Sequence, residues 1–142
     1  MIKPLMAMRV MLADDNAPVR RTLKALLERE GFMVVGEASD GEQAVALAHK
    51  QRPDVILLDL SMPLLNGIEA ARQIHKTLPK TQTIILTIHR DHHYVVKALE
   101  AGVRGYILKG RAAEELAEGV HQVAEGKLFL SRGLAQKIAP KV

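Results

Sequence analysis

Short apolar runs alternate with longer amphipathic segments along most of the chain. The runs are rich in Val, Ile and Leu, and three of them show little alternation of polar and apolar positions, which is typical of strands covered on both faces. Each is followed by a segment in which apolar residues recur every three or four positions, as on one face of a helix. The five runs cover residues 9–13, 33–38, 54–59, 83–87 and 105–108.

The amphipathic segments also carry signals that end a helix. Gly31, Pro53, Pro79, Gly102 and Gly126 each follow an apolar pattern of helical spacing, and glycine or proline in that position ends a helix. Five repeats of strand and helix predict an α/β fold, in which parallel strands are joined by right-handed helical crossovers.

Composition narrows the class of protein without changing this prediction. The 142 residues suit one domain, and 48% of them are hydrophobic, enough for a substantial core. The absence of cysteine excludes disulfides, thiol nucleophiles and Cys-ligated zinc. The net charge of +4 is mild, and the scarcity of aromatic residues argues against direct binding of single-stranded nucleic acid. No apolar run approaches the roughly 18 residues of a membrane helix, and we expect a cytoplasmic protein.

Polar side chains stand at the ends of four of the five predicted strands. Asp14 and Asp15 follow the first strand, Asp59 ends the third, Thr87 ends the fourth and Lys109 follows the fifth. Ligands of open parallel sheets bind beyond the carboxyl ends of the strands. We therefore expect these side chains to meet at one edge of the sheet.

The three carboxylates predict a metal site. Carboxylates within a few ångströms raise one another's pKa values, and they stay ionised together only beside a cation. Because the expected ligands are oxygen atoms, without Cys or a well-placed His, Mg²⁺ is the favoured ion. We expect Asp14, Asp15 and Asp59 to bind it, with the backbone carbonyl of Ser61 completing the shell.

The same residues predict phosphoryl transfer. A carboxylate beside Mg²⁺ can attack a phosphoryl group and form an aspartyl phosphate. We expect one of these carboxylates to be the nucleophile, Lys109 to bind one phosphate oxygen as a point charge, and Thr87 to hydrogen-bond another. Such a site works by positioning and electrostatics.

Taken in order, these motifs resemble the receiver domain of bacterial two-component response regulators. The resemblance covers residues 8–126 and implies a flavodoxin-like, doubly wound sheet of five parallel strands in the order 2-1-3-4-5, with five helices. It also implies that a sensor histidine kinase phosphorylates Asp59 and that Thr87 and Tyr106 form a switch pair. The motifs are DD (14–15), LLDLSMP (57–63), NG (66–67), LT (86–87) and GYILK (105–109).

The end of the chain is similar to NarL/LuxR-type regulators, in which a helix-turn-helix DNA-binding domain follows the receiver. We expect residues 8–126 to form the receiver, and residues 127–142 to form a tail or linker toward an output domain that these 142 residues do not contain. Ser131 could cap a short helix that extends through Ile138. Apolar residues continue after residue 126 with nothing predicted for them to pack against, which favours a piece of a longer protein over a stand-alone receiver.

The resemblance implies a signalling function rather than enzymatic turnover. We expect self-catalysed phosphorylation and slow dephosphorylation, and a change of conformation that promotes homodimerisation. The dimer could use the surface of the fourth helix, fifth strand and fifth helix, or that of the first and fifth helices. DNA would be bound only through the output domain, and no membrane is expected as a partner.

Other interpretations of the same residues stay open. A Mg²⁺-dependent phosphatase on a similar sheet commonly has a second aspartate two residues after the nucleophile, and Ser61 in that place argues against it. A phosphorylation-independent interaction domain would not need the full set of acidic, Thr and Lys side chains. Tyr106 could be a half-buried packing residue. His89 and His93 have the i, i+4 spacing of a zinc site, but we expect His89 in the loop before a helix and no metal there.

Overall fold

One parallel sheet organises the molecule. The structure, a computed structural model, describes residues 8–134, and within them six strands lie in the order β2-β1-β3-β4-β5-β6. The first five strands are the predicted ones, in the order that the family resemblance implies. Their bounds are β1 Arg9–Ala13, β2 Met33–Ala38, β3 Val55–Asp59, β4 Gln82–Thr87 and β5 Gly105–Leu108, followed by the short β6 Phe129–Leu130.

Side-chain caps fix where three of the connecting helices begin. Asn16, Asp40 and Asn66 each accept a hydrogen bond from the backbone N–H three residues later, at 2.8 to 3.0 Å. Such a cap satisfies one of the free donors of the first helical turn. The helices are α1 Ala17–Arg29, α2 Gly41–Gln51, α3 Gly67–Thr77, α4 His92–Glu100 and α5 Ala112–Ala124, with a 3₁₀ helix, η2 Lys109–Arg111, before α5.

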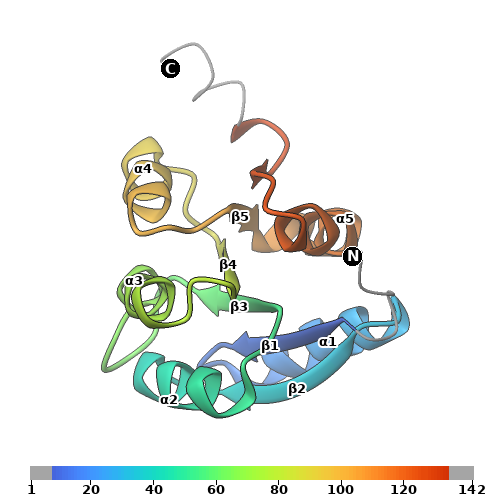
Figure 1. The fold of residues 1–142 in the computed structure, drawn as a ribbon. Coiled ribbons are helices and arrows are strands. Elements are labelled where there is room, and N and C mark those ends of the chain that lie inside the picture. Colours follow the sequence, from blue (N-terminus) through green and yellow to red (C-terminus); the bar gives the residue numbers. More distant parts are fainter. Residues whose placement is uncertain (1–7, 135–142) are drawn as a thin grey trace.

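The sheet separates two hydrophobic layers (Figure 1). Ile56 and Ile85 pack in the layer covered by α2, α3 and α4, whereas their neighbours Leu57 and Ile84 pack in the layer covered by α1 and α5. Neighbouring residues of a strand point to opposite faces, so a strand covered on both faces must be apolar throughout. This explains the continuous apolar runs of β3 and β4.

The chain after α5 differs from the expectation. β6 pairs in parallel with β5, with Gly105 opposite Phe129 and Tyr106 opposite Leu130. Leu134 is buried in the layer that contains α4. The expectation that apolar residues after 126 have nothing to pack against is therefore wrong, and the sheet has six strands instead of five. The rest of the helix predicted through Ile138 lies outside the described residues.

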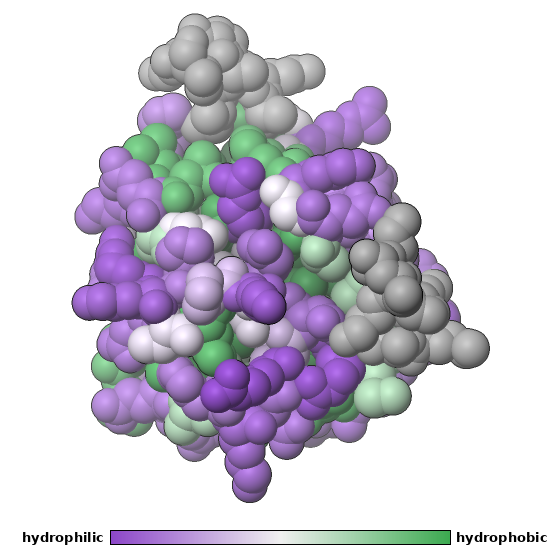
Figure 2. Space-filling view, viewed as in Figure 1, coloured by the Kyte–Doolittle hydropathy of each residue, from purple (hydrophilic) through white to green (hydrophobic). Residues whose placement is uncertain are grey.

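The surface is mainly polar on the face shown in Figure 2, with hydrophobic side chains gathered near the top, where Figure 1 places α4 and β6. Across residues 8–134, none of the helices is both long and apolar enough to cross a bilayer.

Candidate functional site

Three carboxylates meet at the carboxyl ends of β1 and β3. Asp14 directly follows β1, and its backbone N–H donates a 3.0 Å hydrogen bond to the carbonyl of Ala38 at the end of β2. Asp14 and Asp59 are buried, whereas Asp15 is exposed. One oxygen from each carboxylate lies within 4.8 Å of the others. The structure thus brings together the three acidic residues that the strand ends predict.

Lys109 reaches into this acidic cluster from the other side of β4. It is the first residue of η2, and its Nζ lies 3.0 Å from Asp14 Oδ2 and 3.3 Å from Asp59 Oδ1. These contacts join residues that are 95 and 50 positions apart in sequence. They form because the carboxyl ends of the parallel strands β1, β3 and β5 lie at the same edge of the sheet. The ammonium therefore offsets part of the negative charge of the cluster.

Burial and charge act in opposite directions on these groups. Burial and the neighbouring carboxylate of Asp14 raise the pKa of Asp59, although Lys109 and the backbone N–H of Ser61 lower it in part. For Lys109, burial alone would lower the pKa, but contacts with Asp14 and Asp59 outweigh it and raise the pKa. Each charge in the site therefore depends on its neighbours.

The donor set fits a divalent cation of the hard, oxygen-binding kind. Asp14 Oδ2 is buried, and among the described residues its counter-charge is the Lys109 ammonium at 3.0 Å. Three carboxylate oxygens at this spacing match the ligands that Mg²⁺ prefers. Among the described residues this is the one group of three or more His, Asp or Glu side chains close enough to share an ion.

Thr87 and Tyr106 are linked through the backbone of His89. Thr87, the last residue of β4, is buried, and its Oγ1 accepts a 3.1 Å hydrogen bond from the N–H of His89. The ring of Tyr106 on β5 is fully buried, and its hydroxyl donates a 2.9 Å hydrogen bond to the carbonyl of His89. The tyrosine is therefore fully buried instead of half-buried, and both members of the expected switch pair bond to the backbone of His89.

His89 lies in the loop between β4 and α4, as expected from the sequence. Its Nε2 is 3.5 Å from the hydroxyl of Ser61, and its ring packs against that of Tyr94. Sequence reasoning missed that His89 connects the Thr87 and Tyr106 side chains. Those contacts use its backbone groups, which no residue type reveals.

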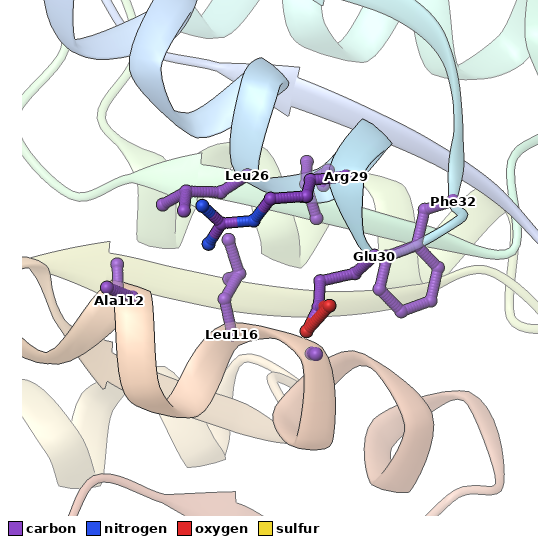
Figure 3. Close-up of a pocket in the computed structure, with 9 residues that line it drawn as sticks. Leu26, Arg29, Glu30, Phe32, Ala112 and Leu116 are labelled. Atoms are coloured by element: carbon purple, nitrogen blue, oxygen red, sulfur yellow. The ribbon is translucent and has the colours of Figure 1, made fainter.

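Another hollow lies away from the acidic cluster, between the end of α1 and the start of α5. Arg29 and Glu30 lie on its α1 side, and Ala112 and Leu116 line its α5 side (Figure 3). It contains none of the predicted site residues.

Comparison with known proteins places these features in a family. The model of the response regulator receiver domain family matches residues 10–121. The chain is 41% identical over 131 residues to the uncharacterized transcriptional regulatory protein YxjL of Bacillus subtilis, covering 92% of this chain and 60% of the relative. It is 37% identical over 131 residues to the response regulator UvrY of Escherichia coli, with the same coverage. The chain therefore spans about 60% of the length of these curated relatives.

Solved structures of response regulators have the same fold as this chain. A two-component response regulator of the LuxR family from Aurantimonas superposes with a TM-score of 0.90 at 35% identity, covering 95% of this chain and 97% of that one. The signal receiver domain of the putative response regulator NarL from Mycobacterium tuberculosis superposes with a TM-score of 0.82 at 32% identity, covering 85% and 98%. The chain belongs to the receiver domains of two-component response regulators, of the NarL/LuxR type.

Proposed function

We propose that this chain accepts a phosphoryl group on Asp59 from the phosphohistidine of a sensor histidine kinase. The observation that carries the proposal is the meeting of Asp59, Asp14 and Lys109, with a carboxylate oxygen of each aspartate within 3.3 Å of one ammonium. Of the three carboxylates, Asp59 at the end of β3 is the one at the position that the family resemblance assigns to the phosphoacceptor.

Asp14, Asp15 and Asp59 would hold Mg²⁺, with the backbone carbonyl of Ser61 as a further ligand. When bound, the ion supplies positive charge that neutralises the carboxylates and the incoming phosphoryl oxygens. The burial of the Asp14 oxygen Oδ2, which has a single ammonium as its counter-charge among the described residues, supports this assignment.

The chain's own residues would position the reacting groups. An oxygen of the Asp59 carboxylate attacks phosphorus, a new O–P bond forms, and the P–N bond to the donor histidine breaks with its electron pair leaving on nitrogen. Lys109 would bind one phosphoryl oxygen and Thr87 another, where negative charge develops in the transition state. Slow attack by water would later release inorganic phosphate, so phosphorylation and dephosphorylation are self-catalysed.

The phosphorylated state would then be read through conformation. When Thr87 turns toward the phosphoryl group, it gives up its hydrogen bond with the N–H of His89, whose carbonyl holds Tyr106. This shifts the population of the His89 loop and favours homodimerisation. Residues 127–142 would lead to a helix-turn-helix output domain outside this sequence, through which a longer protein binds DNA and controls transcription in the cytoplasm.

Intact-mass measurement tests the phosphoacceptor directly. Wild type incubated with acetyl phosphate and Mg²⁺ should gain a single adduct of about 80 Da, the mass of one phosphoryl group. Asp59→Asn should gain none, and wild type without Mg²⁺ should gain little. Asp40→Asn is the matched control, because asparagine keeps the N-cap of α2 and leaves the acidic cluster untouched.

Two outcomes would contradict the proposal. An adduct on Asp59→Asn would place the phosphoryl group on another residue. Steady turnover of small phosphomonoesters, without an accumulating adduct, would instead identify the Mg²⁺-dependent phosphatase.

A further inference from the structure

Glu115 on α5 is a buried side chain outside the site that has three hydrogen-bond partners. Its Oε1 accepts a short hydrogen bond from the hydroxyl of Ser131, and its Oε2 accepts bonds of 2.9 Å from the backbone N–H of Arg132 and from Arg111 Nε. Only 8% of the residue is exposed. The proposed phosphoryl transfer uses none of these contacts.

Ser131 joins this carboxylate to the end of β5. It is completely buried, its backbone N–H donates a 2.9 Å hydrogen bond to the carbonyl of Tyr106, and its hydroxyl oxygen accepts a 2.8 Å bond from the N–H of Leu108. Residues 129–132, which we call the strap, are therefore tied both to β5 and to α5.

The strap and α5 together hold the residues on either side of Lys109. Leu108, the residue before it, donates to Ser131, and Arg111, two residues after it, binds Glu115. Lys109 itself extends from this clamped segment to Asp14 and Asp59. A movement of the Lys109 backbone would have to break or shift the bond of Leu108 to Ser131 or that of Arg111 to Glu115.

Glu115 is held in its charged form. Burial alone would raise its pKa, but hydrogen bonds from Ser131, the Arg132 N–H and Arg111 lower the pKa below its ordinary value. A charged acceptor with three donors makes stronger hydrogen bonds than a neutral one, so the clamp is intact at neutral pH.

We propose that Glu115 and Ser131 are positioning residues for Lys109 and that they couple the phosphorylation site to the chain segment leaving the domain. This rests on the proposed function, because the phosphoryl group on Asp59 is what pulls on Lys109. A phosphoryl group that binds the ammonium stiffens residues 108–111 and thereby tightens the strap. By thermodynamic reciprocity, the docked strap favours phosphorylation to the same degree.

Hydrogen exchange tests the clamp without phosphorylation. In Ser131→Ala the N–H of Leu108 loses its acceptor, so its exchange should be roughly three- to tenfold faster, as expected for one lost hydrogen bond. Glu115→Gln should accelerate exchange at Arg132. Glu118→Gln is the matched control on the same helix, since Glu118 is exposed and bonds only to Gln122 among the hydrogen bonds described.

Phosphorylation tests the coupling. In wild type, formation of the adduct should slow exchange at Leu108 and Arg132 by threefold or more, with no such change in Ser131→Ala. Ser131→Ala and Glu115→Gln should each lower the rate of adduct formation from acetyl phosphate roughly three- to tenfold, and the double variant should be no slower than the worse single one. A residue with a merely structural role would lower stability without these site-specific changes.

The outcomes separate the two proposals. A full adduct on wild type with unchanged exchange in the strap would overturn the coupling and leave the phosphoacceptor role intact. Unchanged exchange at Leu108 in Ser131→Ala would overturn the clamp. No adduct on wild type would remove both proposals.

Discussion

The charges of Asp14, Asp59 and Lys109 depend on one another, because each side chain is partly or wholly buried and the ammonium contacts both carboxylates. Asp14 is 1% exposed, and its buried Oδ2 has the Lys109 ammonium as its counter-charge. The pKa of Asp59 is raised by burial and by Asp14. Carboxylates held this close together repel one another, and the ammonium or a divalent cation relieves that repulsion.

Replacing Lys109 by glutamine tests how much its positive charge stabilises the two buried carboxylates. Lys109→Gln leaves Asp14 buried without a cation, so the free energy of unfolding should fall by about 1–3 kcal/mol in the absence of Mg²⁺. Millimolar Mg²⁺ should recover more than half of the loss, because the metal takes over the role of the ammonium. Urea denaturation with and without Mg²⁺ measures both quantities. Lys97→Gln, at an exposed position of α4, is the control, and no stabilisation of Lys109→Gln by Mg²⁺ would refute the metal assignment.

The hydroxyl and the ring of Tyr106 should have separable effects. Tyr106→Phe loses only the hydrogen bond to the His89 carbonyl, so stability should fall by about 1 kcal/mol. Tyr106→Ala also opens a cavity in a fully buried position and should cost about 3–5 kcal/mol. Both variants should still form the adduct on Asp59, but dimerisation should no longer follow phosphorylation in Tyr106→Ala. Sedimentation of the phosphorylated variants checks this, and unchanged coupling in Tyr106→Ala would argue for a packing role alone.

The sequence predicts that a residue belongs to a functional site only where a rule links its position along the chain to its position in the fold. Parallel strands share one functional edge, so Asp14, Asp59, Thr87 and Lys109 could be found from strand ends alone. No such rule finds Glu115 or Ser131, because their contact joins positions 16 residues apart through a strand pairing of only two residues. A serine after an apolar pair looks like a helix cap, and only the tertiary fold shows its other use.

Among the elements, the long periodic ones were predictable and the short edge strand was not. β1 to β5 are each four to six residues long and strongly apolar, which is enough to identify a strand by composition. β6 has two residues and becomes a strand only because β5 offers a free edge to pair with. Covering that edge also removes a template for unwanted pairing with other chains.

The link between β6 and α5 should be acid-sensitive. Because the pKa of Glu115 is lowered in the folded protein, its contribution to stability is complete above its ordinary value of 4.5 and is lost as pH falls through the folded-state pKa. Wild type should therefore exceed Glu115→Gln in unfolding free energy by roughly 1–2 kcal/mol at pH 7, and the difference should shrink below about pH 4.5. Denaturant titrations across this range measure it, and a pH-independent difference would mean that shape, not charge, makes the contact.

Two surfaces of the whole molecule could meet a second copy of the chain: one at β5 and α4, the other between α1 and α5. On the β5 side, the chain's own strap pairs with the sheet edge, and Leu134 packs in the layer of α4. Between α1 and α5, the hollow of Figure 3 is lined mainly by apolar side chains, with the exposed Arg29 and Glu30 of opposite charge on its α1 side. A two-fold arrangement makes the same patch meet itself, so Arg29 of each copy could pair with the partner's Glu30. We therefore expect the phosphorylated dimer to use α1 and α5.

Charge reversal distinguishes this dimer from one built on α4. Arg29→Glu and Glu30→Arg each place like charges across the two-fold axis. An exposed ion pair contributes little energy, but the symmetry makes each pair occur twice, so each variant should weaken the phosphorylated dimer roughly three- to tenfold. The double variant Arg29→Glu/Glu30→Arg restores opposite charges and should recover wild-type dimerisation, whereas Lys97→Glu on α4 should have little effect. Sedimentation velocity of each phosphorylated variant gives the dissociation constants. A dimer built on α4 would bring Lys97 to the interface and leave Arg29 and Glu30 outside it. If Lys97→Glu weakens the dimer and the α1 reversals do not, the interface therefore lies on the α4 face.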